Sequence, residues 1–442
     1  MRPDYYAGRP AEKLKNRIFT IEAKTEIINS FFVKEADVNM NAQRLIDCGV
    51  VLTNPLSVEI ADSIVPERIS PGVVIHSGCR LSGAETSIGP GSKIGGEAPA
   101  TIDDCQLGRN VELKGGFFSG ATFLDKVSMG SGAHVRSGTL LEEESGGAHA
   151  VGFKQTIFFP FVTSGSLINF CDAIMSGGTN RSNHSEIGSS YIHFNFSPHQ
   201  DKATASLIGD VPRGVFLNQP PIFLGGQGGL VGPTRIAHGV VLPAGAICRQ
   251  DVLEENTLFV PRALAGGSVK YVVGAYRNID RILRNNLIYI GNLWALLQWY
   301  RFVRIRTMSG DPFLEACRAG AIRQIENGIG ERIKRLRELA KKMPFSLEYA
   351  ENGKSAPLPP EVKAMQQALS ERWPEIEARL MRGPGDSIGA AAREKFLNVW
   401  EKSPAEGGHI EAVRALRTEA RETGSKWLRE IVDAASAIMP IT

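Results

Sequence analysis

Cysteine is scarce in this sequence, and its distribution argues against the sites that depend on it. The 442 residues contain six cysteines, with no C-x-x-C pair and no spacing typical of metal ligands. The pattern favours free, buried thiols in a reducing compartment over disulfides or a structural zinc site.

Long apolar runs are also missing. Leu287–Tyr300 is the most apolar helical stretch, yet it carries Asn292 and Gln298 and is too short to span a bilayer. The N-terminal part is charged throughout residues 13–24 and shows no apolar segment of a signal peptide. From the sequence we therefore expect a cytoplasmic protein.

Glycine, in contrast, is abundant, and most of the 47 glycines lie before Ser268. In the same region aliphatic side chains recur at steps of six, a period that fits neither an α-helix nor a single exposed sheet. Three short flat strands per coil, with small residues at the corners, explain this period, so we predict a parallel β-helix over residues 49–265. A glycine-rich β-sandwich is the alternative, but its strands would vary in length. The repeating positions are Ile69, Ile75, Leu81, Ile88, Ile94, Leu107, Leu113, Phe123, Met129, Val135 and Leu141.

The last predicted coils contain the segments Phe223-Leu224-Gly225, Leu230 to Pro233, Pro243-Ala244-Gly245 and Arg249 to Val252. These segments are similar to the closing coils of a known family, the acetyltransferase half of the bacterial bifunctional N-acetylglucosamine-1-phosphate uridyltransferase/glucosamine-1-phosphate acetyltransferase. Upstream, residues 133–139 and Gly147-Ala148-His149 are also similar to family segments, and residues 44–50 look like the short helix that leads into its β-helix.

The resemblance covers about half of the chain and implies a left-handed, hexapeptide-repeat β-helix. It further implies a homotrimer whose sites are completed by a neighbouring copy, acetyl-CoA or another acyl-CoA as donor, and a sugar phosphate or nucleotide sugar as acceptor. The residues before Gly49 are too few for the family's nucleotide-binding domain, so no uridyltransferase half is expected in this chain.

The family's binding residues can be carried over position by position. Arg136 matches an arginine that grips the sugar phosphate, a role that suits the bidentate guanidinium group. Asn195 and Lys202 complete the expected substrate-binding set, and each of the three could instead be a solvated charge or a turn residue. The expected coenzyme A contacts are Gly226, which stands where the family has a serine, Ala244 and Arg262.

The family's catalytic base has no direct counterpart. By order along the chain, Phe170 stands where the family has the histidine that deprotonates the acceptor amine, and phenylalanine cannot take a proton. Residues 178–186 break the six-residue period nearby, so we expect the base to be His184 or His193. The rival hypothesis is a catalytically silent β-helix that binds a sugar nucleotide or serves as a scaffold. No metal site is predicted, because His184, His193 and His199 do not have the required spacing.

Helical periodicity replaces the glycine pattern over residues 276–442. Residues 270–342 carry 15 Lys/Arg against 6 Asp/Glu, a net charge of +9, which leaves −6 for the rest of the chain. Arg301, Arg304 and Arg306 could form a nucleic-acid or membrane-surface patch, but we favour solvated arginines beside an apolar face packed on the β-helix or on another subunit. A linker is expected near 352–360 and a helical lead-in over 1–48. The helices are predicted at Pro312–Met343, Glu361–Met381, Ile388–Lys402 and Ile410–Ile438.

Overall fold

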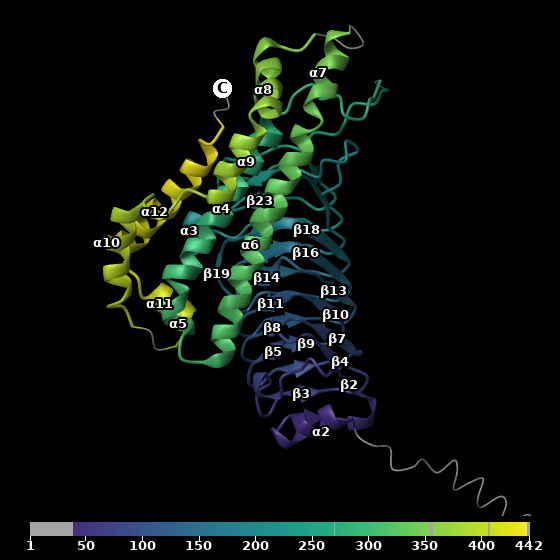
Figure 1. Ribbon diagram of the computed structural model, residues 1–442, viewed down its shortest axis with the longest axis vertical. Helices are drawn as coiled ribbons and strands as arrows, with labels where there is room; N and C mark the ends of the chain where they lie inside the picture. Colours follow the sequence, from purple (N-terminus) through teal and green to yellow (C-terminus); the bar gives the residue numbers. More distant parts are fainter. Residues whose placement is uncertain (1–38, 269, 353–356, 405–406, 440–442) are drawn as a thin grey trace, which may run out of the picture.

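The computed structural model describes residues 39–442, apart from 269, 353–356, 405–406 and 440–442. Most of the predicted lead-in, residues 1–38, lies outside this range. The described part opens with helix α2 (Met40–Asp47), which Asn39 caps by accepting a hydrogen bond from the backbone N–H of Asn41 at 3.0 Å. The predicted helix before the first coil is therefore present, and it closes the end of the β-helix (Figure 1).

The predicted left-handed parallel β-helix is confirmed, with about eleven coils over residues 59–248. Its strands form three faces, and neighbouring strands on every face run parallel. The first face is a ten-stranded sheet. Its strands are β1 (Val51–Leu52), β3 (Val74–Ile75), β6 (Lys93–Ile94), β9 (Glu112–Leu113), β12 (Ser128–Met129), β15 (Gly146–Gly147), β17 (Thr163–Ser164), β21 (Glu186–Ile187), β24 (Phe223–Leu224) and β27 (Val241–Leu242).

The second and third faces share two long strands, β16 (Val151–Phe158) and β18 (Ile168–Met175), which turn the corner between them. Gln155 and Asp172 make this turn with φ of 54° and 59°. The second face also contains β2 (Glu59–Ile60), β4 (Arg80–Ser82), β7 (Ala100–Asp103), β10 (Gly116–Ser119), β13 (Ala133–Val135), β22 (Ile192–Phe194), β25 (Gly229–Val231) and β28 (Ile247–Cys248). The third face also contains β5 (Ser87–Ile88), β8 (Gln106–Leu107), β11 (Ala121–Phe123), β14 (Thr139–Leu141), β23 (Ser206–Ile208) and β26 (Arg235–Ile236).

The core is the column of side chains that point into the coils. Every aliphatic or aromatic position of the six-residue pattern, from Ile69 to Leu141, is at most 1% exposed. Burying one such side chain contributes about 1.5–3 kcal/mol, so the repeated pattern is what stabilises the stack. The sequence period thus identified both the fold and its interior.

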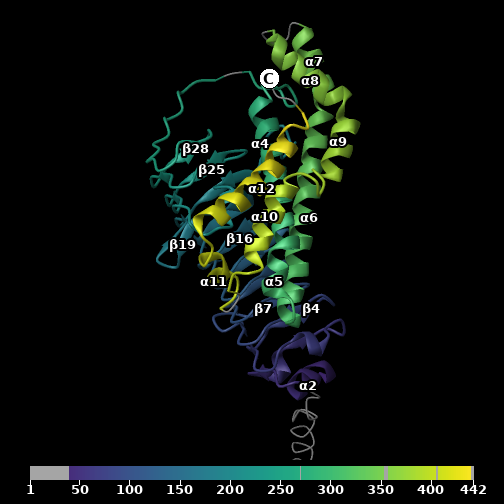
Figure 2. The ribbon, with the colours of Figure 1, turned by 90° about the vertical axis from the view of Figure 1, so that its left-hand side faces the viewer.

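The C-terminal helices pack together along the third face (Figures 1 and 2). The predicted helix over 361–381 is two helices, because Pro374 belongs to a helix start and cannot lie inside a continuous helix. The predicted helix over 410–438 is also interrupted, at residues 415–417. The helices are α4 (Asp280–Phe302), α5 (Arg304–Met308), α6 (Pro312–Ala340), α7 (Met343–Glu351), α8 (Pro360–Glu371), α9 (Trp373–Arg382), α10 (Ala390–Trp400), α11 (His409–Arg414) and α12 (Thr418–Ser436), with the short α3 (Val211–Gly214) among the coils.

Residues of α6 that are four or eight positions apart contact successive coils of the β-helix. Gly320 lies so close to the third face that a Cβ there would come within 2.2 Å of Gln106 Oε1. One helical turn later, Gln324 Oε1 accepts the backbone N–H of Gly138 at 2.9 Å. Arg332, two turns further on, reaches the corner residue Asp172. One side of α6 is therefore matched to successive corners of the β-helix (Figure 1).

The expectation of solvated arginines is wrong for Arg304. This side chain is 0% exposed and forms an ion pair with Glu143 at the edge between the third and first faces. Beside it, the Tyr300 hydroxyl donates to Glu142 Oε1 at 2.5 Å, and burial raises the pKa of the Glu142 carboxyl to about 7. Arg304, the first residue of α5, thus attaches the helical region to the β-helix. None of the helices in the described ranges is long and apolar enough to cross a bilayer.

Candidate functional site

Arg136 directly follows β13 on the exposed second face, where side chains alternate inward and outward. Val135 points into the core, while His134 and Arg136 on either side of it are exposed. The backbone N–H of Arg136 donates to Phe153 O at 2.9 Å, which places Lys154 beside Arg136 in the next coil. Neighbouring strands of a sheet lie about 4.8 Å apart, so the two cations lie close together on one surface.

A gap lies above a glycine beside these cations. Gly152 pairs with His134 on one side and with Asn169 on the other. A Cβ at Gly152 would meet only Ile168 O, at 3.7 Å, so the space above this glycine is open. His134, Arg136, Lys154 and Asn169 surround the gap, and we call these four residues the Arg136 cluster. The His134 ring is held by stacking on Phe117, with centroids 5.0 Å apart.

The Arg136 cluster carries positive charge without a local counter-ion. Within the described part of the chain, neither Arg136 nor Lys154 forms an ion pair. Like charges on adjacent strands repel, so an anion between them would be stabilised. Cys171, the next residue along this column, is no nucleophile, because burial raises the pKa of its thiol to about 11. The cluster can hold a phosphate, and the one titratable ring that it offers is His134.

Asn195 and Arg332 meet at the edge of the same face. Asn195 Nδ2 donates to Asp172 Oδ2 at 2.5 Å, and Arg332 donates to Asp172 Oδ1 at 2.5 Å. The Arg332 side chain is only 2% exposed and comes from α6, 160 residues along the chain. The predicted substrate residue Asn195 therefore lies near the cluster but serves the contact between the two regions. Nothing in the sequence pattern connects Asp172 with Arg332.

His193 is an interior histidine. It is 1% exposed, with Nδ1 against Cys171 O at 2.5 Å and Nε2 against Ser206 Oγ at 2.8 Å. Burial lowers its pKa, so the ring is neutral at neutral pH. Phe170 is also interior, at 0% exposure, and the residue that this strand presents to solvent is Asn169.

His184 and Lys202 lie on other parts of the β-helix. His184 belongs to the hairpin β19 (Gly178–Asn180) and β20 (Asn183–His184) at the edge between the third and first faces, where its Nδ1 lies 3.2 Å from Ser185 O. Lys202 is exposed in the loop that follows β22. Among the described residues, His, Cys, Asp and Glu side chains nowhere gather in threes close enough to hold a metal ion.

The predicted cofactor residues lie at the far end of the stack. Gly226 and Ala244 are in successive turns at the edge between the first and second faces, and the N–H of Gly245 donates to Gly226 O at 2.9 Å. The turn of Ala244 is five strands beyond Arg136 on the second face, or roughly 24 Å at the spacing of a sheet. Arg262 is exposed in the segment after the last coil. An extended cofactor would be needed to join these residues to the Arg136 cluster.

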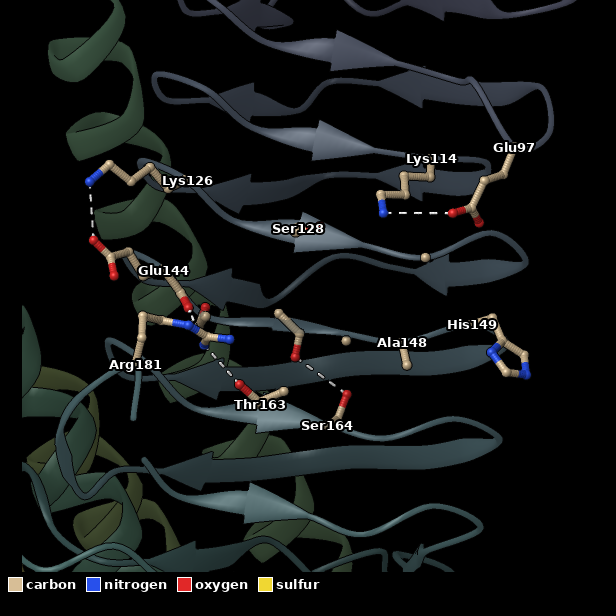
Figure 3. Close-up of a pocket in the computed structure, with 14 residues that line it drawn as sticks. Glu97, Lys114, Lys126, Ser128, Glu144, Ala148, His149, Thr163, Ser164 and Arg181 are labelled. Carbon is tan, nitrogen blue, oxygen red and sulfur yellow. Dashed lines mark hydrogen bonds and ion pairs between the residues drawn. The ribbon is translucent and has the colours of Figure 1, made fainter. Parts of the chain in front are cut away.

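A second hollow, of about 680 Å³, lies on the first face (Figure 3). Its floor forms because three successive strands present small residues outward, namely Ser128, Gly146 and Thr163. Its rim carries the ion pairs Lys114–Glu97, at 3.6 Å, and Lys126–Glu144, at 3.2 Å. Within each pair the positive and negative charges neutralise each other.

Arg181 supplies a further charge to this hollow. The hairpin β19–β20 carries it back over two earlier coils, where Nη1 donates to Glu144 O at 2.8 Å and to Thr163 Oγ1 at 2.9 Å. Because these acceptors are neutral, they fix the guanidinium without cancelling its charge. The break in the six-residue period thus has a structural result: it places one oriented cation beside a polar hollow.

Comparison with known proteins agrees with the fold. No protein-family profile matches the chain. The bifunctional protein GlmU of Thermotoga petrophila is 26% identical over 211 residues, which are 48% of this chain and 42% of that protein. GlmU of Pelobacter propionicus is 28% identical over 205 residues, or 46% and 39% of the two chains. GlmU of Trichlorobacter lovleyi is 26% identical over 238 residues, or 54% and 46%.

The alignments thus cover less than half of each relative and about half of this chain. The matched lengths, 205 to 238 residues, are comparable with the length of the β-helix. Over about half of its length this chain is similar in sequence to the GlmU proteins, and its β-helix fits the acetyltransferase half of that family.

Proposed function

We propose that the protein transfers an acyl group from acyl-coenzyme A to a sugar phosphate or nucleotide sugar. The observation that carries this proposal is the Arg136 cluster: two cations without a counter-ion on an exposed face of a β-helix homologous to GlmU. Arg136 and Lys154 hold the phosphate of the acceptor through charge-assisted hydrogen bonds. They thereby position its amine or hydroxyl over the gap at Gly152.

Acyl transfer requires a group that removes the proton of the attacking amine or hydroxyl. We propose His134 for this role, because it is exposed and lies on the same strand face as Arg136. His193 is a weaker candidate, since both of its ring nitrogens are occupied in the interior. His184 remains the alternative base. Its site would need residues from another surface to bind the acceptor.

Bound acyl-coenzyme A supplies the acyl group as a thioester. When the acceptor nitrogen or oxygen bonds to the acyl carbon, the acceptor proton would pass to the base, the carbon–sulfur bond would break, and coenzyme A would leave as a thiolate that takes up that proton to give the free thiol. Gly226 and Ala244 would line the path of the cofactor along the edge of the stack, since neither side chain extends beyond a methyl group. Arg262 would bind phosphates of the cofactor.

The rival proposal, a silent β-helix that binds a sugar nucleotide or acts as a scaffold, has one observation in its favour. Phe170, which stands at the family's base position by chain order, is an interior residue, and His193 beside it is also buried. A chain that binds acceptor and coenzyme A but shows no turnover would be of this kind.

The acceptor site is tested by calorimetry with glucosamine 1-phosphate. Arg136→Gln and Lys154→Gln are each expected to weaken binding about ten- to one-hundred-fold, because each loses a hydrogen bond to a charged group. Arg80→Gln is the matched control, as an exposed arginine on the same face that pairs with Glu59 at 3.1 Å. If Arg181→Gln weakens binding instead, the acceptor binds in the hollow of Figure 3, and the assignment to the Arg136 cluster is wrong.

We also propose that the protein is a homotrimer with shared sites. The helices lie along the third face, so the first and second faces are left for contacts between copies (Figure 1). Light scattering at micromolar concentration should give three times the chain mass of 47.9 kDa, about 144 kDa. A mass of one chain would contradict both the trimer and a site that needs a neighbour.

A further inference from the structure

A cavity of about 750 Å³ lies at the upper end of the molecule, away from the Arg136 cluster. It is lined by the loop after β22, residues 270–278 and helix α7, together with Ile282 of α4 and Leu358. We propose that this cavity binds a nucleoside phosphate. The proposal does not rest on acyl transfer, because it concerns a pocket that the helical region builds onto the β-helix.

Aromatic rings form one wall of the cavity. The His199 ring lies between Tyr276, with centroids 4.3 Å apart at 32°, and Tyr271, with centroids 5.2 Å apart at 37°. Tyr276 is buried, whereas Tyr271 is 53% exposed and can contact a ligand. Tyr349 of α7 also lines the space. Planar rings of this kind stack on nucleobases whatever the base.

The His199 ring offers a hydrogen-bond donor in this wall. Its Nδ1 accepts the backbone N–H of Gly274 at 3.0 Å. Burial lowers the pKa of His199 and outweighs the opposing charge of Asp201, so the ring is neutral at neutral pH. A neutral ring that accepts at Nδ1 carries its proton at Nε2. That N–H can donate to a carbonyl or ring nitrogen of a base.

The charge of the cavity favours an anion. Lys270 and Arg277 line it, and no aspartate or glutamate is among the described residues that do so. The acidic residue behind the wall, Asp201, is 2% exposed and accepts the Tyr276 hydroxyl at 2.5 Å and the N–H of Ala203 at 2.8 Å. Two lining cations therefore face the ligand without a lining carboxylate.

These features together select the ligand class. A sugar phosphate would use the cations but not the rings, and an apolar ligand would use the rings but not the cations. A nucleoside phosphate uses both, and the volume suits a molecule of that size. The nucleotide could be free or could be the nucleotide end of a larger molecule such as coenzyme A or a nucleotide sugar.

The test measures binding of ADP, UDP and coenzyme A to the full chain by calorimetry and saturation-transfer NMR. Tyr271→Ala should weaken binding of at least one of them fivefold or more through lost stacking, and Arg277→Gln by about tenfold through a lost phosphate contact. Both side chains are exposed, so folding should tolerate either change. The matched control is Arg284→Gln on α4, an exposed arginine that pairs with Asp280 at 2.7 Å.

The relative affinities for the three ligands show whether the bound nucleotide is free or part of a larger molecule. Similar affinities for ADP and UDP indicate a site for free nucleotides or nucleotide sugars, whereas tighter binding of coenzyme A with the same sensitivity to Tyr271→Ala indicates its nucleotide end. The proposal is overturned if none of the three ligands binds at millimolar concentration, or if binding is unchanged in both variants. Turnover of acetyl-coenzyme A is measured on the same variants. Binding that is unchanged in both variants, with turnover retained in the unaltered chain, overturns this proposal alone, whereas loss of both coenzyme A binding and turnover contradicts the proposed function as well.

Discussion

Replacing Arg332 by alanine should lower the free energy of unfolding by about 3–5 kcal/mol. Arg332 is 1% exposed and donates to Asp172, which also accepts Asn195. Removing the cation leaves the Asp172 carboxylate, only 14% exposed, without its charged partner. This ion pair also links α6 to the β-helix, so its loss should loosen the contact between the two regions.

The measurement is urea unfolding followed by circular dichroism. Arg335→Ala is the matched control, because Arg335 lies three residues further along α6, pairs with Glu331 and is 20% exposed. That variant should cost about 1 kcal/mol or less. The double change Asp172→Ala with Arg332→Met removes both charges and should restore part of the loss. Equal stability of the Arg332→Ala and Arg335→Ala proteins would contradict the structural role of this pair.

The β-helix could be predicted from the sequence because every coil needs inward side chains at the same positions. One inward side chain per face, such as Leu107 or Leu113, recurs at the period of the coil, and every such position is buried. The helical region was recognised by its own period, although prolines and short breaks divide it more finely than the periodicity indicated. Both successes come from patterns that repeat at a fixed period along the sequence.

The contacts that shape the sites are of another kind. Asp172 and Arg332 are 160 residues apart, and Arg181 reaches a backbone carbonyl 37 residues earlier, at Glu144. Neither partner could be named from local spacing, because each depends on how the helices and the hairpin fold back. The family comparison likewise followed order along the chain, and so it pointed to Phe170 rather than to the face on which a base must lie.

A signal for His134 was nevertheless present in the sequence. Val135 belongs to the six-residue pattern and must point inward, and successive side chains of a strand alternate. His134 and Arg136 must therefore point outward together. The structure confirms this alternation, with Val135 at 0% exposure between two exposed neighbours. Reading the period together with the alternation would have placed a histidine beside the expected phosphate ligand.

If His134 is the base, His134→Ala should reduce kcat about 10²–10⁴-fold, the usual effect of losing a general base, and leave the affinity for the acceptor nearly unchanged. Arg136→Gln should show the opposite division, with weaker binding as its main effect. Turnover is measured by the release of free thiol from acetyl-coenzyme A with glucosamine 1-phosphate as acceptor.

The other histidines provide the comparison. His184→Ala should retain most of the activity, because its ring lies on a different edge of the β-helix. His193→Ala should destabilise the protein instead, since it removes a buried ring and leaves Ser206 Oγ without that partner. If His184→Ala loses turnover while His134→Ala keeps full activity, the reaction takes place at the edge that carries the hairpin β19–β20. Binding of both substrates without turnover by the unaltered chain would instead favour the silent β-helix, because the exposed histidine would then not act as a base.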